Sequence, residues 1–208
     1  MYELNKIREE KLKKIFEEEL HQDPQNIYLL FKLALLEIEP PRGDDVKCTK
    51  HLEQILAFDI DNAQALILLA YLKNTCLFEE ADEHFMNKLT SLKSSSNELN
   101  SMLRYVASCF FQFKGNREKQ IFFLEESIAL DPENVWSYFD LAQRYFSQSK
   151  NLEAKELIHK ALKNIKKVYD DSFDDYDKTS LNDFLNHNIK GIYVTKEQKE
   201  IIEEMLDR

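Results

Sequence analysis

Large apolar residues and alanines recur along the chain at helical spacing. In a first type of segment, two large apolar residues three positions apart are followed at once by an alanine, as in Leu66, Leu69 and Ala70. The alanine recurs at intervals of 36, 37 and 35 residues, at Ala34, Ala70, Ala107 and Ala142. An alanine where two helices cross lets their axes approach, while large residues fill the space on either side. The pattern predicts four helices of this type, each packed against a neighbour.

A second type of segment follows the first and starts with a small or polar residue. Residues 154–161 show its spacing, with Ala154, Ile158 and Ala161 on one helical face, and residues 120–127 repeat that spacing. The two types alternate along the chain. Each repeating unit is therefore predicted to be a pair of helices.

The boundaries of the units are marked by proline. Residues 23–34 align without a gap with residues 131–142, an offset of 108, or three times 36, and both stretches begin with Asp-Pro. Proline cannot continue a helix, and the Asp or Asn beside it can cap the next one. We expect units that start near residues 24, 60, 97 and 132.

The end of the third unit carries a family resemblance. Residues 124–134, Leu-Glu-Glu-Ser-Ile-Ala-Leu-Asp-Pro-Glu-Asn, resemble the signature end of a tetratricopeptide (TPR) repeat. The small and large positions of the following unit match the spacing of that family at Leu141, Ala142, Tyr145, Ala154, Ile158 and Ala161. The resemblance covers about residues 24–165, and residues 11–20 look like the second helix of a leading half-repeat. It implies an all-α, right-handed TPR-like α-solenoid of about four helix pairs over residues 1–167.

Residues 168–208 differ from the repeats and are expected to form an acidic C-terminal extension. Between residues 168 and 177 five aspartates alternate with aromatic residues, a pattern that fits either a solvated loop or a dock for a basic partner. The stretch lacks the alternate oxygens, central Gly and closing Glu of a calcium-binding EF-hand loop. Thr195 and Gln198 predict a capping box that opens a final helix.

Composition narrows the fold and the function. The 208 residues include three Gly and four Pro, too few for the turns of a many-stranded sheet protein, and the isolated glycines form no phosphate-binding loop. With 28 Lys and Arg against 38 Asp and Glu, the net charge is −10, which argues against nucleic acid and favours a basic protein partner. The longest apolar run, residues 65–72, is far too short to cross a membrane. The N-terminus lacks the apolar core of a signal peptide, and three cysteines without a CxxC motif fit reduced thiols, so we expect a cytoplasmic protein.

Catalytic and metal-binding patterns are not found in the sequence. The five histidines never lie three or four positions apart, and none has a cysteine at ligand spacing. Motifs such as GxSxG and HExxH are absent. We expect neither an enzyme nor a metal or cofactor site.

The resemblance places the binding groove on the first helix of every unit. Projection of that face, together with the acidic extension, gives a candidate partner-binding set of Tyr28, Phe31, Leu35, Ile67, Tyr71, Arg104, Phe111, Trp136, Phe139, Phe146, Asp170, Asp171, Asp174 and Asp175. The set is mostly apolar, whereas family members that grip acidic peptide C-termini use Lys and Asn there, so we expect no such clamp. Three interpretations stay open: a partner inserts into the groove, the C-terminal extension fills it, or the projected residues belong to the core.

We therefore expect a protein–protein interaction module that binds a protein or peptide, preferably a basic one. A more specific alternative is an immunity-type inhibitor that neutralises a basic toxin. A second alternative is a secretion or assembly chaperone that shields apolar client segments. The sequence does not indicate an oligomeric state.

Overall fold

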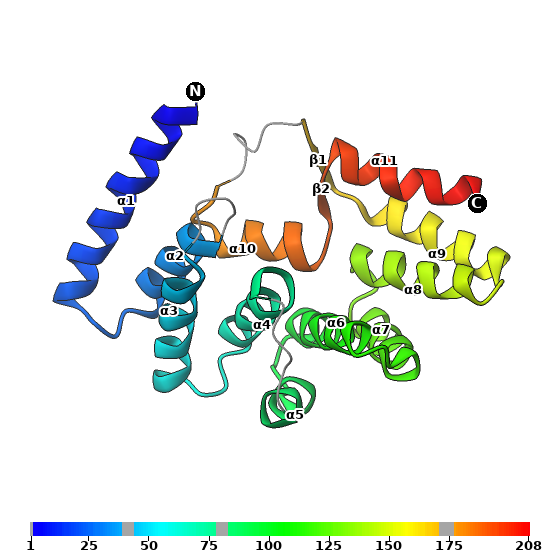
Figure 1. Ribbon diagram of the computed structural model, residues 1–208, viewed down its shortest axis with the longest axis horizontal. Helices are drawn as coiled ribbons and strands as arrows, with labels where there is room; N and C mark the ends of the chain where they lie inside the picture. The colour runs from blue at the N-terminus through cyan, green and yellow to red at the C-terminus, as the bar shows by residue number, and fades with distance from the viewer. Residues whose placement is uncertain (1, 39–43, 78–82, 171–176) are drawn as a thin grey trace. The chain divides into compact units, whose positions relative to one another are not determined.

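The computed structural model describes residues 2–38, 44–77, 83–170 and 177–208 (Figure 1). The chain divides into two compact units. Unit 1 comprises Met1–Phe78 and Asp177–Leu181, and unit 2 comprises Glu79–Tyr176 and Asn182–Arg208. The predicted division at residue 167 between repeats and extension stays a prediction about domains.

Unit 1 consists of helices. In order these are α1 (Tyr2–Gln22), α2 (Ile27–Ile38), α3 (Asp45–Phe58), α4 (Ala63–Leu72) and the π-helical turn η1 (Lys73–Leu77). Helix α1 packs on α2, α2 on α3 and α3 on α4, so neighbours in sequence are neighbours in space.

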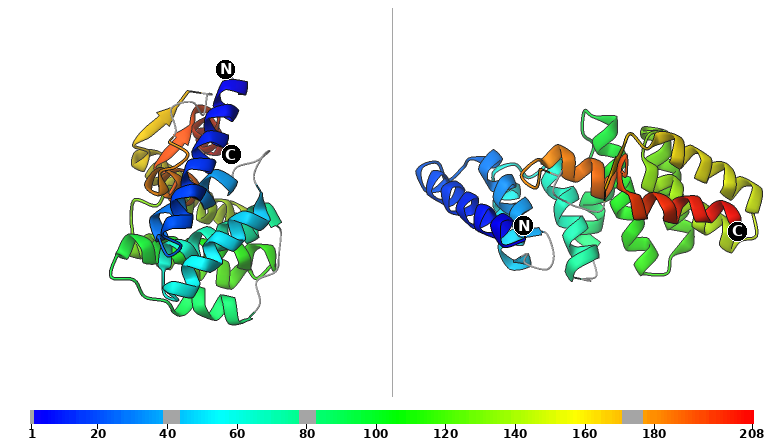
Figure 2. Two further views of the ribbon diagram at one scale, coloured as in Figure 1. Left: turned by 90° about the vertical axis from the view of Figure 1, so that its left-hand side faces the viewer. Right: turned by 90° about the horizontal axis from the view of Figure 1, so that it is seen from above.

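Unit 2 combines helix pairs with a C-terminal segment of mixed structure. Its helices are α5 (Glu83–Ser91), α6 (Asn97–Phe113), α7 (Arg117–Leu130), α8 (Val135–Ser147) and α9 (Asn151–Asn164). There follow β1 (Lys167–Tyr169), α10 (Leu181–Phe184), the π-helical turn η3 (Leu185–Ile189), β2 (Tyr193–Thr195), α11 (Lys196–Glu204) and the 3-10 turn η4 (Met205–Asp207). Strands β1 and β2 pair in parallel, and α11 lies beside α9 (Figures 1 and 2).

The predicted fold class is confirmed: the chain is an all-α, TPR-like solenoid. Within the described residues, α2 packs on α3 in unit 1, and α6 packs on α7 and α8 on α9 in unit 2. The alanines that defined the repeat, Ala34, Ala70, Ala107 and Ala142, are all fully buried. They mark the positions where helices approach each other closely.

Each first helix begins with a side-chain cap. The oxygens of Asn26, Asn62, Ser96 and Asn134 accept hydrogen bonds from the backbone N–H groups of Leu29, Ala65, Leu99 and Ser137, at 3.2, 3.0, 3.3 and 3.1 Å. A cap of this kind satisfies a donor that has no partner within the helix. The Asn that recurs after Asp-Pro is therefore a helix start signal, as the repeat pattern predicts.

Candidate partner-binding surfaces

One side of α8 contacts residues 187–192 of the C-terminal segment, and we call this side of α8 the covered face. The indole Nε1 of Trp136 donates a 3.0 Å hydrogen bond to the carbonyl of His187 in η3. Gly191 lies against the same ring with φ +73°, and a Cβ atom built there would be 2.7 Å from the indole. Only glycine combines this backbone conformation with so close an approach.

Lys190 fixes the segment to the start of α8. Its Nζ lies 2.6 Å from Glu98 Oε1, 2.9 Å from Asp131 Oδ2 and 3.5 Å from Glu133 Oε2, and its side chain is 5% exposed. Burial acts to lower the pKa of Lys190, but the hydrogen bonds to Glu98 and Asp131 outweigh it and leave the pKa above its usual 10.5. The ammonium is therefore charged and held by three carboxylates.

The backbone of Lys190 also forms hydrogen bonds with the first turn of α8. Its carbonyl accepts hydrogen bonds from the N–H groups of Val135 at 2.8 Å and Trp136 at 3.4 Å. These are donors in the first turn of the helix, which no intrahelical carbonyl can satisfy. Asp131 belongs to the repeated Asp-Pro motif. The motif that ends α7 therefore also forms an ion pair with Lys190 of the C-terminal segment.

The rest of the C-terminal segment joins the core of unit 2. Ile192, Ile202 and Met205 are buried in one cluster with residues of α8 and α9. The predicted capping box is present, with Thr195 and Gln198 bonded in both directions at the start of α11. A segment with this much apolar burial stabilises the end of the repeat stack.

Three predicted site residues on α8 meet this segment or its cluster. Trp136, Phe139 and Phe146 are half-buried and pack against the core cluster that contains Ile202 and Met205. The rings of Trp136 and Phe139 meet edge to face, with centroids 6.1 Å apart. Of the three interpretations, the contacts of Trp136 with His187 and Gly191 correspond to the one in which the extension folds back.

Three further predicted residues lie in the core and need correction. Phe31, Leu35 and Ile67 are 6%, 1% and 0% exposed, so a partner cannot reach them in this conformation. The reason is the composition of their helices, since α2 and α4 are apolar on nearly every face and such helices are buried all round. Of the remaining predicted residues in unit 1, Tyr28 is 65% exposed and Tyr71 half-buried.

On α6 the predicted face is rotated. Arg104 forms an ion pair with Glu126 of α7, at 3.2 Å, and donates to the carbonyl of Leu89 of α5, at 3.3 Å. Phe111 stacks on Phe123 of α7, with ring centroids 5.2 Å apart. The contacts of both predicted residues are therefore with α5 and α7.

The rotation comes from the alignment of the third unit. The buried residues of this unit precede those of the fourth by 34 positions: Ser108 and Ala142, Gln120 and Ala154, Leu124 and Ile158, Ser127 and Ala161. The sequence pattern instead paired Ala107 with Ala142. An offset of one residue turns a helical face by 100°, which moved Arg104 and Phe111 to the wrong side.

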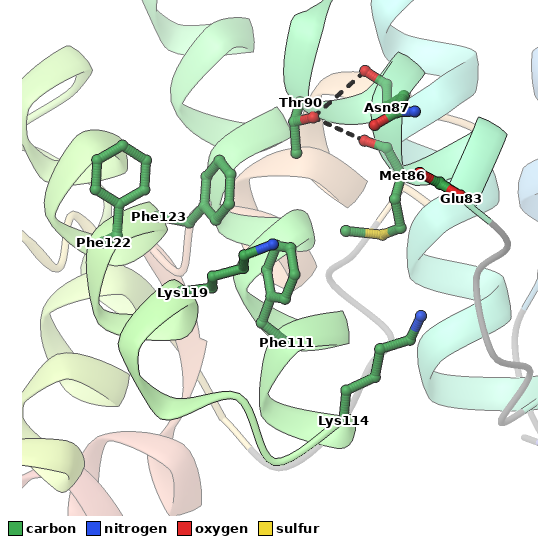
Figure 3. A pocket seen from close by; sticks show the side chains of 9 residues that line it. All are labelled: Glu83, Met86, Asn87, Thr90, Phe111, Lys114, Lys119, Phe122 and Phe123. Atoms are coloured by element: carbon green, nitrogen blue, oxygen red, sulfur yellow. Dashed lines mark hydrogen bonds between the residues drawn. The ribbon is translucent and has the colours of Figure 1, made fainter.

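A pocket lies where α5, α6 and α7 meet in unit 2 (Figure 3). Its volume is about 400 Å³, and its lining residues are Glu83, Met86, Asn87, Thr90, Phe111, Lys114, Lys119, Phe122 and Phe123. Phe122 and Phe123 meet edge to face at 5.2 Å, and Lys119 Nζ lies 5.2 Å from the centroid of the Phe111 ring. Phe122 is 53% exposed. We call this site the aromatic pocket; the projection of the groove named only Phe111 among its residues.

The acidic end is described only in part. Asp170 is exposed directly after β1, whereas Asp171, Asp174 and Asp175 lie outside the described residues.

Burial raises the pKa of the Cys109 thiol to about 12, with a further contribution from Asp140, so this thiol is not an activated nucleophile. Among the residues described, no group of three or more His, Cys, Asp and Glu side chains could hold a metal ion. Within the same ranges, no helix is long and apolar enough to cross a membrane.

Comparisons with known proteins support the fold. Neither a protein-family model nor a curated protein matches the sequence. The solved structures similar to this chain include two of MamA, a TPR-repeat protein. One has a TM-score of 0.54 and the other 0.56, each at 19% identity. The matches cover 73% and 78% of this chain, and 85% and 86% of the respective MamA chains. The fold is TPR-like. At this identity the likeness concerns the fold alone.

Proposed function

We propose that this chain is a protein–protein interaction module whose unit 2 binds a partner at the aromatic pocket. Helix pairs of the TPR type form scaffolds that present grooves and pockets to other proteins. The aromatic pocket is the observation that carries the proposal. Three phenylalanines and a methionine surround a cavity that remains open.

The exposure of an aromatic residue also supports the aromatic pocket as the partner-binding surface. Phe122 lines the pocket and is 53% exposed. Exposed aromatic residues beside a cavity are typical anchors for a protein partner, because their burial on binding gives much of the affinity. The covered face of α8, by contrast, already contacts the protein's own C-terminal segment.

Tyr28, Tyr71 and the acidic residues Asp170, Asp171, Asp174 and Asp175 remain proposed additional contacts. Asp170 is exposed, and a row of carboxylates would attract a basic surface at long range. In this proposal the acidic end steers a partner and the aromatic pocket anchors it.

The experiment is photo-crosslinking in the full-length protein. A photoreactive phenylalanine analogue replaces Phe122 in one sample and Leu152 in the other. Leu152 is a matched control because it is apolar, lies in unit 2 and is 79% exposed away from the pocket. The proposal predicts a defined crosslinked partner from position 122 and none from position 152. Equal crosslinking from both positions, or none from position 122, would overturn it.

The identity of a crosslinked partner also separates the more specific alternatives. An immunity-type inhibitor requires a basic toxin, released at high salt if the acidic end contributes to binding. A secretion or assembly chaperone requires a client with apolar segments, and its binding would respond weakly to salt.

A further inference from the structure

Two charged residues of α8 occupy positions that are apolar in the preceding unit. At the offset of 34 positions that relates the buried residues of the third and fourth units, Asp140 corresponds to Val106. Arg144 corresponds in the same way to Phe110. Val106 and Phe110 are 3% and 1% exposed, whereas both charged residues are half-buried. Charges at positions that the repeat otherwise fills with apolar side chains cost stability, so they indicate a function other than folding.

The guanidinium group of Arg144 lacks a partner. Its Nε atom is buried and donates no hydrogen bond to any residue that the structure describes. Asp140 lies one helical turn earlier and attracts the guanidinium electrostatically, but the two side chains do not form an ion pair. Buried donors are almost always hydrogen-bonded in folded proteins, and an exception often marks a bound water or ion. The unpaired Nε therefore points to an anionic ligand.

Helix α6 forms the other side of this site. Tyr105 of α6 donates a hydrogen bond to Asp140, and Cys109 lies close enough for Asp140 to affect its pKa. We call Arg144, Asp140 and Tyr105 the arginine site. Neither Asp140 nor Arg144 is among the residues projected onto the groove, so the site differs from a clamp of Lys and Asn at those groove positions.

We infer that the arginine site binds one carboxylate group of a ligand. A guanidinium presents its N–H donors in a planar fork that matches the two oxygens of a carboxylate, and Nε is one of those donors. Residues four positions apart on a helix are neighbours, so the bound carboxylate lies beside Asp140. Two carboxylates at such a distance do not both stay ionised, so binding takes up one proton from solvent, which the two groups share. A phosphate dianion would keep a charge beside Asp140 after the same uptake, and it fits less well.

The environment of Asp140 favours this proton uptake. Burial raises the pKa of Asp140 to about 6, although Arg144 and Tyr105 act in the opposite direction. The thiol of Cys109, with a pKa of about 12, stays protonated over the same range. A second carboxylate raises the pKa of Asp140 further, so carboxylate binding is linked to protonation. We expect binding at about pH 5.5 to be at least about fivefold tighter than at about pH 7.5.

The test is an NMR titration of the full-length protein that follows the backbone and Nε N–H signals of Arg144. The probes are sodium acetate, a short peptide with a free C-terminal carboxylate, and an amidated peptide whose only carboxylate is an aspartate side chain. Their relative affinities distinguish a free acid, a chain terminus and an acidic side chain as the source of the carboxylate. We expect a saturable shift with at least one of them, and none with sodium chloride at equal ionic strength. No saturable shift with any probe, or tighter binding of sodium phosphate than of acetate, would overturn the inference.

Two single variants test the role of Arg144. Arg144→Gln is expected to weaken carboxylate binding at least about tenfold, measured from the backbone signal of residue 144. Arg117→Gln removes the same charge from an exposed position at the start of α7 and is expected to change the affinity less than about twofold. Equal losses in both variants would reduce the effect to net charge and contradict a specific site.

Asp140→Asn tests the coupled proton. The variant cannot take up a proton at this position, so its affinity for the carboxylate should be nearly equal at the two pH values. An unchanged pH dependence in this variant would show that Asp140 does not share a proton with the ligand.

The inference is independent of the proposed function. The arginine site shares no residue with the aromatic pocket, and crosslinking from position 122 tests only the pocket. A failed carboxylate titration leaves the proposed function intact, and a failed crosslinking experiment leaves the arginine site intact.

Discussion

Two regions of unit 2 carry aromatic side chains on helix surfaces, and they differ in what covers them. On the covered face, Trp136 contacts Gly191 and Lys190 meets three carboxylates. At the aromatic pocket, Phe111 and its neighbours surround a cavity of about 400 Å³. The difference shows that aromatic residues alone do not identify a binding surface. Such a surface is unavailable to a partner where a segment of the same chain with matching shape and charge packs against it.

Lys190→Met should cause the largest loss of stability among the variants that test this comparison. It leaves Asp131 buried beside Glu98 without their cation, while Glu133 keeps its pair with Lys166, and loss of one partner of a buried ion pair costs about 3–5 kcal/mol. We expect the free energy of unfolding in urea to fall by about that amount.

Lys166→Met is the matched control for this prediction. Lys166 also pairs with Glu133, at 2.6 Å, but its side chain is 50% exposed. An exposed pair contributes at most about 1 kcal/mol. Equal losses for the two variants would mean that Lys190 does not fix the C-terminal segment.

Gly191→Ala should have the next largest effect. The new methyl group meets the Trp136 ring at 2.7 Å in a backbone conformation with φ +73°. Overpacking and left-handed strain together should lower the free energy of unfolding by about 2–4 kcal/mol.

Gly115→Ala separates strain from contact. Gly115 has a similar φ of +69°, but nothing lies within 4 Å of an added Cβ. Backbone strain alone should cost about 1 kcal/mol. If the two variants lose the same stability in urea unfolding, Gly191 is not in close contact with the covered face.

Asp140→Asn tests the polar side of α8. Burial raises the pKa of Asp140 from 3.8 to about 6, against the opposing effects of Arg144 and a hydrogen bond from Tyr105. A carboxyl group that holds its proton more tightly in the folded state favours folding most below pH 4. This contribution is lost as pH rises from about 4 to about 6. The difference corresponds to about 3 kcal/mol at most, at about 1.36 kcal/mol per pKa unit.

The asparagine variant removes that titration. We expect it to match the wild type near pH 4 and to be more stable by about 1–2 kcal/mol near pH 7.5, because it avoids burying a charge. Urea unfolding at the two pH values measures the difference. An equal offset at both pH values would show that the carboxyl group of Asp140 does not titrate in this range.

The repeat could be predicted from sequence because one local pattern determines it. Asn26, Asn62 and Asn134 cap helices, and the recurring alanines are buried, as their spacing indicates. The side of a helix that faces the groove is harder to predict. The alignment of Ala107 instead of Ser108 with Ala142 placed Arg104 and Phe111 on the predicted groove face, whereas their contacts are with α5 and α7. The contact of Lys190 with Asp131 joins residues 59 positions apart, and no local pattern predicts such a pair.

The aromatic pocket was missed for a related reason. Its walls come from α5, α6 and α7, and Met86, Phe111 and Phe122 show no common spacing in the sequence. The one local signal is that Phe122 falls between the core positions Gln120 and Leu124 of α7, so the repeat pattern does not account for an aromatic residue there.

Phe122→Ala should have the smallest effect on stability. It therefore gives the clearest test of whether the aromatic pocket binds a partner. The ring is 53% exposed, so its removal should lower the free energy of unfolding by only about 0.5 kcal/mol, as is usual for surface positions. Phe110→Ala, at the residue before the pocket residue Phe111 and 1% exposed, should instead cost about 3–5 kcal/mol. Urea unfolding of both variants, beside Leu152→Ala, measures the contrast. A loss above about 2 kcal/mol for Phe122→Ala would place the ring in the core, and reduced partner binding could then reflect unfolding. A small loss with reduced binding assigns the effect to the surface, because the fold remains intact while the anchor is gone.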